Sequence, residues 1–202
     1  MTNPLLSDWN TAFGIAPFDK ISDKDFSSAL DEALVADMAE TRAIAEQKEE
    51  PTFENTIHAM FSKGRDLDKV LSVFYTVSGA DSNPAREALM REFSPKLSAH
   101  TSEIIANEAL FHRIDSLWKK RHELGLNAEE ARVLMLTHRN FVRSGAALKG
   151  AEKERMKDIK SRLSILGTDF SQNLLADERD WFMPLAEADM EGLPDFLISA
   201  AK

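Results

Sequence analysis

The sequence predicts an all-α protein, built as an elongated array of antiparallel helical hairpins. Apolar residues recur at steps of three and four over long segments, which is the period of an amphipathic helix. The 202 residues include only 8 Gly, 7 Pro and 1 Tyr, whereas sheet proteins depend on aromatic and β-branched residues and on many turns. With 43% apolar and 29% charged residues the chain can bury a core, and we expect one helical domain over residues 1–202.

The first elements are an arm and a long helix. Residues 1–20 contain large apolar side chains without a helical period, so we expect an extended arm that packs against the helices. Long helices are expected over residues 21–180. The first begins at Ser22, whose Ser-Asp-Lys-Asp sequence is similar to a capping box, and its apolar stripe extends to about Lys48.

The second helix begins at a well-marked boundary. Pro51 disfavours helix in the residue before it, and Thr52 can cap the helix that follows. The apolar stripe then indicates one helix of about six turns, from Phe53 through Gly64 to about Ser78.

Asparagines mark the starts of the next three helices. Asn83 precedes a proline suited to a first helical turn, and Asn107 and Asn127 can cap the two helices after it. Pro95 predicts a kink or a break near residues 92–94, because proline removes a helical donor. We expect the helix that Asn107 starts to end at Gly125.

The last long helix carries an almost heptad apolar seam from Met156 to Leu174. We expect its partner to be the helix that ends near Leu148, folded back around Gly150 as a hairpin. Residues 181–202 predict an extended segment, Trp181 to Leu185, and then the start of a helix at Gly192-Leu193-Pro194. Because Lys202 ends the sequence a few residues later, we interpret that helix as truncated.

Charge and cysteine content exclude several classes of function. A net charge of −9 argues against nucleic acid and anionic membranes as partners, since both need a positive surface. The absence of cysteine excludes disulfides, thiolate zinc sites and cysteine nucleophiles, and a reducing cytoplasm is the expected location. We find neither a signal peptide at the amino terminus nor a segment long enough to span a membrane.

The histidines do not form a recognisable metal motif. A zinc-binding H-E-x-x-H helix needs two histidines four residues apart, and no pair here has that spacing. His122-Glu123 is the nearest imitation, but Gly125 should end its helix. Glu54 and His58 could form a metal pair or an ordinary solvent-facing ion pair. We therefore predict no catalytic, metal-binding or cofactor-binding residue in this chain.

The candidate substrate contacts are His138, Arg139 and Arg143, the densest polar cluster on a predicted helix. Two arginines could pair with peptide carboxylates in a substrate channel. Alternatively, they fix the hairpin by pairing with acidic neighbours, while Gly145 allows close helix contact and His138 is a hydrogen-bonded core residue. The basic run from Lys149 to Arg162 has interleaved acids, which favours a solvated face over an anion-binding stripe.

Five segments, in order along the chain, carry a family resemblance. They are Ile15-Ala16-Pro17-Phe18 with Asp25-Phe26-Ser27-Ser28-Ala29, Pro51-Thr52-Phe53-Glu54-Asn55-Thr56-Ile57, Asn107-Glu108-Ala109-Leu110-Phe111, Phe141-Val142-Arg143-Ser144-Gly145-Ala146-Ala147-Leu148, and Glu191-Gly192-Leu193-Pro194. Together they resemble the amino-terminal region of the zinc oligopeptidases of the thimet oligopeptidase family, most closely the bacterial branch of peptidyl-dipeptidase (dipeptidyl carboxypeptidase) and oligopeptidase A.

The resemblance implies the amino-terminal helical domain of a larger metallopeptidase. In the complete enzyme it implies one Zn²⁺ held by two His and a Glu, hydrolysis of short peptides, and a carboxy-terminal catalytic domain of the same polypeptide as partner. This chain would form channel wall, with an exposed apolar patch near Trp181 to Ala201 where the rest docks. The alternative is a non-enzymatic helical interaction or scaffold protein that shares only the architecture.

Overall fold

The computed structural model describes residues 3–184 and 186–200, and over these residues the protein is helical, with no strand. The all-α prediction is therefore confirmed. The order of elements is η1 (Ala12–Gly14), α1 (Asp25–Glu46), η2 (Phe53–His58), α2 (Ala59–Ser62), α3 (Arg65–Ala80), α4 (Pro84–Ala106), α5 (Glu108–Lys119), α6 (Ala128–Arg143), α7 (Gly150–Asp180), η3 (Glu187–Met190) and α8 (Asp195–Ala200). In the described segments, no helix is both long and apolar enough to cross a membrane.

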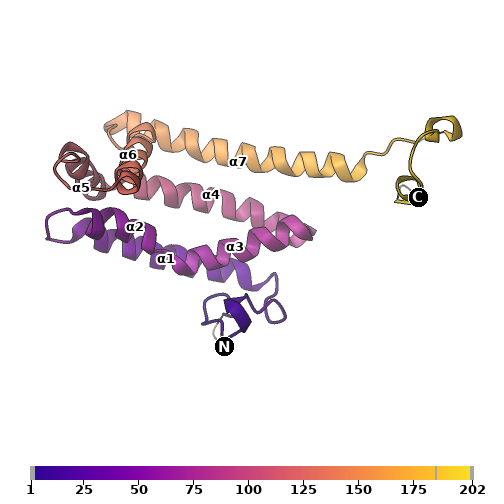
Figure 1. The fold of residues 1–202 in the computed structure, drawn as a ribbon, viewed down its shortest axis with the longest axis horizontal. Coiled ribbons are helices and arrows are strands. Elements are labelled where there is room, and N and C mark those ends of the chain that lie inside the picture. Colours follow the sequence, from indigo (N-terminus) through magenta and orange to yellow (C-terminus); the bar gives the residue numbers. More distant parts are fainter. Residues whose placement is uncertain (1–2, 185, 201–202) are drawn as a thin grey trace. The chain divides into compact units, whose positions relative to one another are not determined.

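The chain divides into two compact units, Met1–Asp169 and Phe170–Lys202, and the division falls inside α7. The prediction of one domain over residues 1–202 stays a prediction. In the first unit, α1, α3, α4 and the beginning of α7 run side by side with alternating direction, and α5 and α6 lie at one end (Figure 1). Polar contacts agree with this order, since Lys96 of α4 meets Asp31 of α1 and Lys153 of α7 reaches the carbonyl of Ala106 in α4.

Two apolar clusters form the core of the first unit. One joins α1, α3, α4 and the arm, where the ring of Phe74 lies 5.2 Å from that of Phe26 and 4.6 Å from that of Phe93, all three fully buried. The arm contributes Leu5, which is completely buried, as expected of an arm that packs on the helices. The other cluster joins the end of α1 to η2, α5 and α6 around Ile57 and Ile114.

The predicted caps on α4, α5 and α6 are confirmed. The side chains of Asn83, Asn107 and Asn127 each accept a hydrogen bond from the third backbone N–H that follows. α5 ends at Lys119, earlier than the predicted end at Gly125, and turns lead from it to α6. Of the kink or break predicted near residues 92–94, the break is wrong, because α4 is continuous through Pro95, and the kink stays a prediction. Proline removes one backbone donor from α4. Phe93 packs in the apolar cluster with α1 and α3, and Ser94 bonds Ser164 of α7, so contacts next to Pro95 hold the helix in place.

The prediction of one helix from Phe53 to Ser78 is also wrong. A π-helical turn, η2, passes into the short α2, and the chain turns at Lys63 and Gly64 before α3 begins. Gly64 adopts a left-handed conformation, with φ of 73°. A Cβ atom at this position would lie 2.5 Å from Oδ1 of Asp37, so the break requires glycine.

Replacing Gly64 with alanine should therefore lower the free energy of unfolding by about 1–3 kcal/mol, because the new Cβ meets Asp37 and the left-handed backbone is strained. Gly79 is the matched control, since a Cβ there would meet nothing within 4 Å inside α3. Gly79→Ala should raise stability by about 0.5–1 kcal/mol through helix propensity. Urea unfolding of both variants measures the difference, and equal stabilities would contradict this role of Gly64.

The expected partner of α7 is wrong as well. Its hydrogen bonds within residues 150–169 run to α4 and the start of α5, not to α6: Ser164 bonds Ser94, and Lys153 bonds the carbonyl of Ala106 and the carboxylate of Glu108. On this stretch Leu163 and Leu166 are 62% and 51% exposed, so the apolar seam does not face a helix of this unit.

The second unit exposes its large apolar side chains. Trp181, Phe182 and Met183 form the predicted non-helical segment, and Phe196 lies in α8, which begins after Pro194 as expected. These four side chains are 62–80% exposed. These apolar side chains are thus exposed, and their grouping into a docking patch stays a prediction; Leu185, Ala201 and Lys202 lie outside the described residues.

Candidate functional site

His138 lies in the interface between α5 and α6. Its ring stacks 5.0 Å from that of Trp118 and 6.1 Å from that of Phe111, and its Nε2 lies 3.2 Å from Oδ1 of Asp115. Burial alone would raise the pKa of Asp115, but hydrogen bonds from Lys119 and His138 outweigh it and lower that pKa. This arrangement matches the interpretation of His138 as a hydrogen-bonded core residue.

Arg139 and Arg143 project from α6 into solvent, away from the contacts of His138. Neither forms an ion pair with any residue that the structure describes, so the proposed pairing with acidic neighbours is not seen. Close helix contact at Gly145 is present: a Cβ there would lie 3.1 Å from Cγ of Met156 in α7. The structure thus does not bring the three candidate residues together, and their contact with substrate stays a prediction.

His58 and His122, the other candidate metal ligands, both lie at the surface or in turns of the structure. Nδ1 of His58 lies 3.1 Å from Oε1 of Glu54, and both side chains are more than half exposed, so the two residues form the expected solvent-facing pair. His122 lies in the turns after α5, where a helical pair of ligands cannot form. Among the side chains that the structure describes, no three of His, Asp or Glu gather as a metal ion would require.

The family-like segment Pro51 to Ile57 is held by Arg113 of α5, which is only 5% exposed. Its guanidinium donates to the carbonyls of Gln47 and Glu49, to Oδ1 of Asn55 and to Oγ1 of Thr56, at 2.9–3.3 Å. Burial lowers the pKa of Arg113, and the nearby charges of Glu49 and Glu50 oppose that shift. Arginine between Leu110 and Ile114 on an apolar face is the sequence signal that could have revealed this contact.

A buried ionic cluster joins α1, the turn before α3, and α4. The carboxylate of Asp37 lies 2.6 Å from Nζ of Lys63 and 2.7 Å from Nε2 of His100, and all three side chains are at least 87% buried. Burial would raise the pKa of Asp37, but the hydrogen bonds from His100 and Lys63 together lower it. No periodicity in the sequence identifies this cluster.

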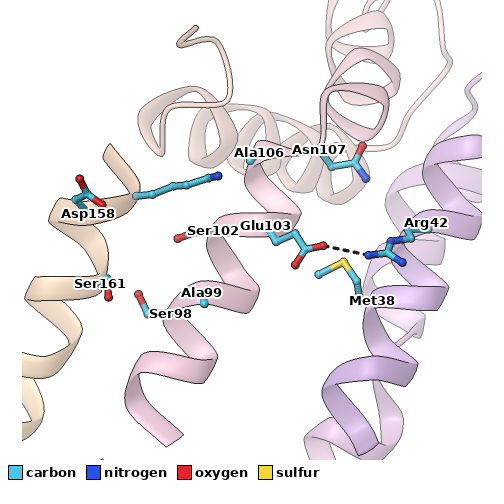
Figure 2. Close-up of a pocket in the computed structure, with 11 residues that line it drawn as sticks. Met38, Arg42, Ser98, Ala99, Ser102, Glu103, Ala106, Asn107, Asp158 and Ser161 are labelled. Atoms are coloured by element: carbon cyan, nitrogen blue, oxygen red, sulfur yellow. Dashed lines mark hydrogen bonds and ion pairs between the residues drawn. The ribbon is translucent and has the colours of Figure 1, made fainter. Parts of the chain in front are cut away.

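A cavity with a mixed polar and apolar lining lies among α1, α4 and α7, within the first unit, and we call it the seam pocket (Figure 2). Its volume is about 580 Å³, in the range of small-molecule sites. α4 forms the middle wall and α1 and α7 stand on either side of it. The polar residues that line the pocket are Arg42, Ser98, Ser102, Glu103, Asn107, Lys157, Asp158 and Ser161.

The seam pocket is a gap in an otherwise hydrogen-bonded contact between α4 and α7. At one end Oγ of Ser94 lies 2.8 Å from both Oγ of Ser164 and Oγ1 of Thr168. At the other end Nζ of Lys153 donates to the carbonyl of Ala106 at 2.9 Å. Between these two contacts the helices line a cavity instead of bonding each other.

Comparison with known proteins identifies relatives of this chain. It is 36% identical to a dipeptidyl carboxypeptidase of Salmonella typhimurium over 87% of its length, and 34% identical to that of Escherichia coli over 86%. It is 26% identical to an oligopeptidase A of Salmonella typhimurium over its full length. These relatives belong to the thimet oligopeptidase family, and the chain matches their amino-terminal region.

This amino-terminal region spans about a quarter of the length of the curated relatives it matches, 26% of the dipeptidyl carboxypeptidases and 29% of the oligopeptidases A. No protein-family model matches the chain. The family resemblance carried by the five ordered segments is confirmed, and the larger relatives are consistent with an amino-terminal domain.

Proposed function

We propose that this chain is the amino-terminal helical part of a zinc-dependent peptidase that hydrolyses short peptides, of the peptidyl-dipeptidase or oligopeptidase type. The observation that carries the proposal is the match to peptidases over 86–100% of the chain. The helices would form part of the wall of a substrate channel. There the exposed guanidinium groups of Arg139 and Arg143 are free to meet peptide carboxylates, and His138 would position the helix that carries them.

The partner of this region is the carboxy-terminal catalytic part of the same polypeptide. Two exposed apolar surfaces support that partner: Leu163 and Leu166 in the first unit, and Trp181 and Phe182 in the second. The proposed location is the cytoplasm, which suits a chain without cysteine. Nucleic acid and membranes are not proposed as partners, given the charge of −9.

The described residues do not fit the zinc ion of the proposed enzyme. A catalytic zinc needs three protein ligands, and no such group of His, Asp or Glu occurs among the described side chains. The zinc motif would therefore lie in the carboxy-terminal part, and we assign no chemical step to this chain.

Metal analysis and a peptidase assay test the proposal together. The isolated chain, dialysed and measured by mass spectrometry for metals, should hold no stoichiometric zinc and should not cleave a fluorogenic peptide. The reading frame should continue beyond Lys202 into several hundred residues with an H-E-x-x-H motif. Tightly bound zinc with turnover in the isolated chain would overturn the assignment, and a natural stop codon at this point would favour a scaffold protein.

A further inference from the structure

We propose that the seam pocket binds a small zwitterion that carries an ammonium group and a carboxylate, a free α-amino acid or a dipeptide. The seam pocket is argued from its own residues, without use of the proposed function. Hydroxyl groups of α4 and α7 line the cavity and provide the first observations.

The unpartnered hydroxyl of Ser102 is the first observation. Ser102 is only 8% exposed, it lines the pocket, and it has no hydrogen-bond partner among the residues that the structure describes. The Oγ atom of Ser102 is not among the fully buried atoms, so this accessible hydroxyl offers both a donor and an acceptor to a molecule that enters the pocket. Figure 2 shows its oxygen directed toward the space between α4 and α7.

The neighbouring hydroxyls repeat this pattern. Ser98 lies one turn before Ser102 on α4 and Ser161 lies opposite on α7, and both line the pocket without a partner in the described chain. One turn further along the same contact, Ser94 and Ser164 do bond each other at 2.8 Å. At the pocket, the serine hydroxyls of α4 and α7 therefore do not bond each other, whereas one turn away a serine pair joins the same two helices.

The charges around the pocket balance, which selects the class of ligand. Arg42 and Lys157 are cationic, and Glu103 and Asp158 are anionic. A simple anion would enter beside two carboxylates and a simple cation beside two cationic groups, whereas a zwitterion can pair with both signs. Met38 and Ala99 supply an apolar surface for a side chain.

Two of these charged groups are available to a ligand. The carboxylate of Asp158 forms no ion pair with a described residue and can accept the ammonium group. Nη2 of Arg42 lies 3.2 Å from Oε1 of Glu103, with the two side chains 60% and 59% exposed, so this weak surface pair can exchange for a ligand carboxylate. Guanidinium groups bind carboxylates well because both are planar and can form two parallel hydrogen bonds.

Nuclear magnetic resonance titration of the ¹⁵N-labelled chain tests the proposal with three probes: leucine, the dipeptide Ala-Leu, and Ala-Leu with an acetylated amino end and an amidated carboxyl end. Leucine or Ala-Leu should cause saturable shifts at the amides of Ser98, Ser102 and Ser161, with a dissociation constant of about 1 mM. The blocked dipeptide should bind roughly tenfold more weakly, because it has lost both charges. The stronger of the two unblocked probes identifies the source of the ligand.

Two matched variants separate the site from the rest of α7. Asp158→Asn should weaken binding roughly tenfold, whereas Asp169→Asn, an exposed acid on the same helix outside the pocket, should leave it unchanged. Ser102→Ala should weaken binding by roughly threefold through one lost hydrogen bond. The proposal is overturned if neither leucine nor Ala-Leu gives saturable shifts, if the blocked dipeptide binds equally well, or if the two aspartate variants behave alike.

Discussion

Replacing Arg113 with alanine should lower the free energy of unfolding by about 3–5 kcal/mol, because several oxygens lose a charged hydrogen-bond donor and a large buried side chain is removed. Arg113 is only 5% exposed, and its guanidinium donates to four oxygens. Those oxygens belong to Gln47, Glu49, Asn55 and Thr56, so they would lose a charged donor together, and a cavity would remain in the core. Urea unfolding followed by circular dichroism measures the change.

The matched variants test whether the guanidinium shape matters. Arg113→Lys keeps the charge but cannot donate in several fixed directions, so it should lose about 2–3 kcal/mol. Arg143→Ala removes an exposed arginine without an ion pair in the described residues and should change stability by less than about 0.5 kcal/mol. In Arg113→Ala, amide hydrogen exchange should rise first around Asn55, whose N–H bonds Thr52. Uniform loss of protection would argue against a local clamp.

The segment Pro51 to Ile57 shows how far local sequence signals extend. The cap by Thr52 could be predicted because a cap depends on residues three positions apart, and the structure contains it in both directions between Thr52 and Asn55. The contact with Arg113 could not be predicted, because it joins residues 57 positions apart in the chain. An arginine on the apolar face of a helix is the one local sign of such a partner.

Hydrophobic periodicity failed where backbone geometry or a distant partner decides. The apolar stripe continues through Gly64, but the left-handed backbone there, next to Asp37, ends the helix. The stripe on α7 predicted a partner helix, yet α7 meets α4 through Ser94 and Ser164 and leaves its leucines exposed. An apolar stripe indicates which residues of a helix avoid water, but it does not indicate which other surface covers them.

The seam pocket had a partial signal in the sequence. Ser94, Ser98 and Ser102 follow one another at steps of four, which places three hydroxyls on one face of a helix. What the sequence could not provide is that α7 bonds the first of them and stands away from the other two. The family resemblance, by contrast, could be recognised from the sequence alone, because it depends on the order of short segments.

Replacing Asp37 with asparagine should lower the free energy of unfolding by about 3–5 kcal/mol near neutral pH, because the buried Lys63 would lose its anionic partner. Asparagine keeps the volume of the side chain, so the loss is not that of a cavity. Asp31→Asn is the matched control on α1: its carboxylate contacts Lys96 at 2.6 Å but is 57% exposed. That change should cost less than about 1 kcal/mol.

Acid titration distinguishes the charge of Asp37 from its packing. The pKa of Asp37 in the folded protein is below its ordinary value of 3.8, so the folded state binds the proton more weakly than the unfolded state. Its stabilising contribution is therefore fully present above pH 3.8 and is lost as the pH falls through the lower folded value. The stability difference between wild type and Asp37→Asn should be large near about pH 5 and should shrink toward about pH 2.5. Other carboxylates titrate in both proteins and cancel in the difference. A difference that stayed constant over this range would show that the asparagine disturbs packing and that the ion pair contributes little.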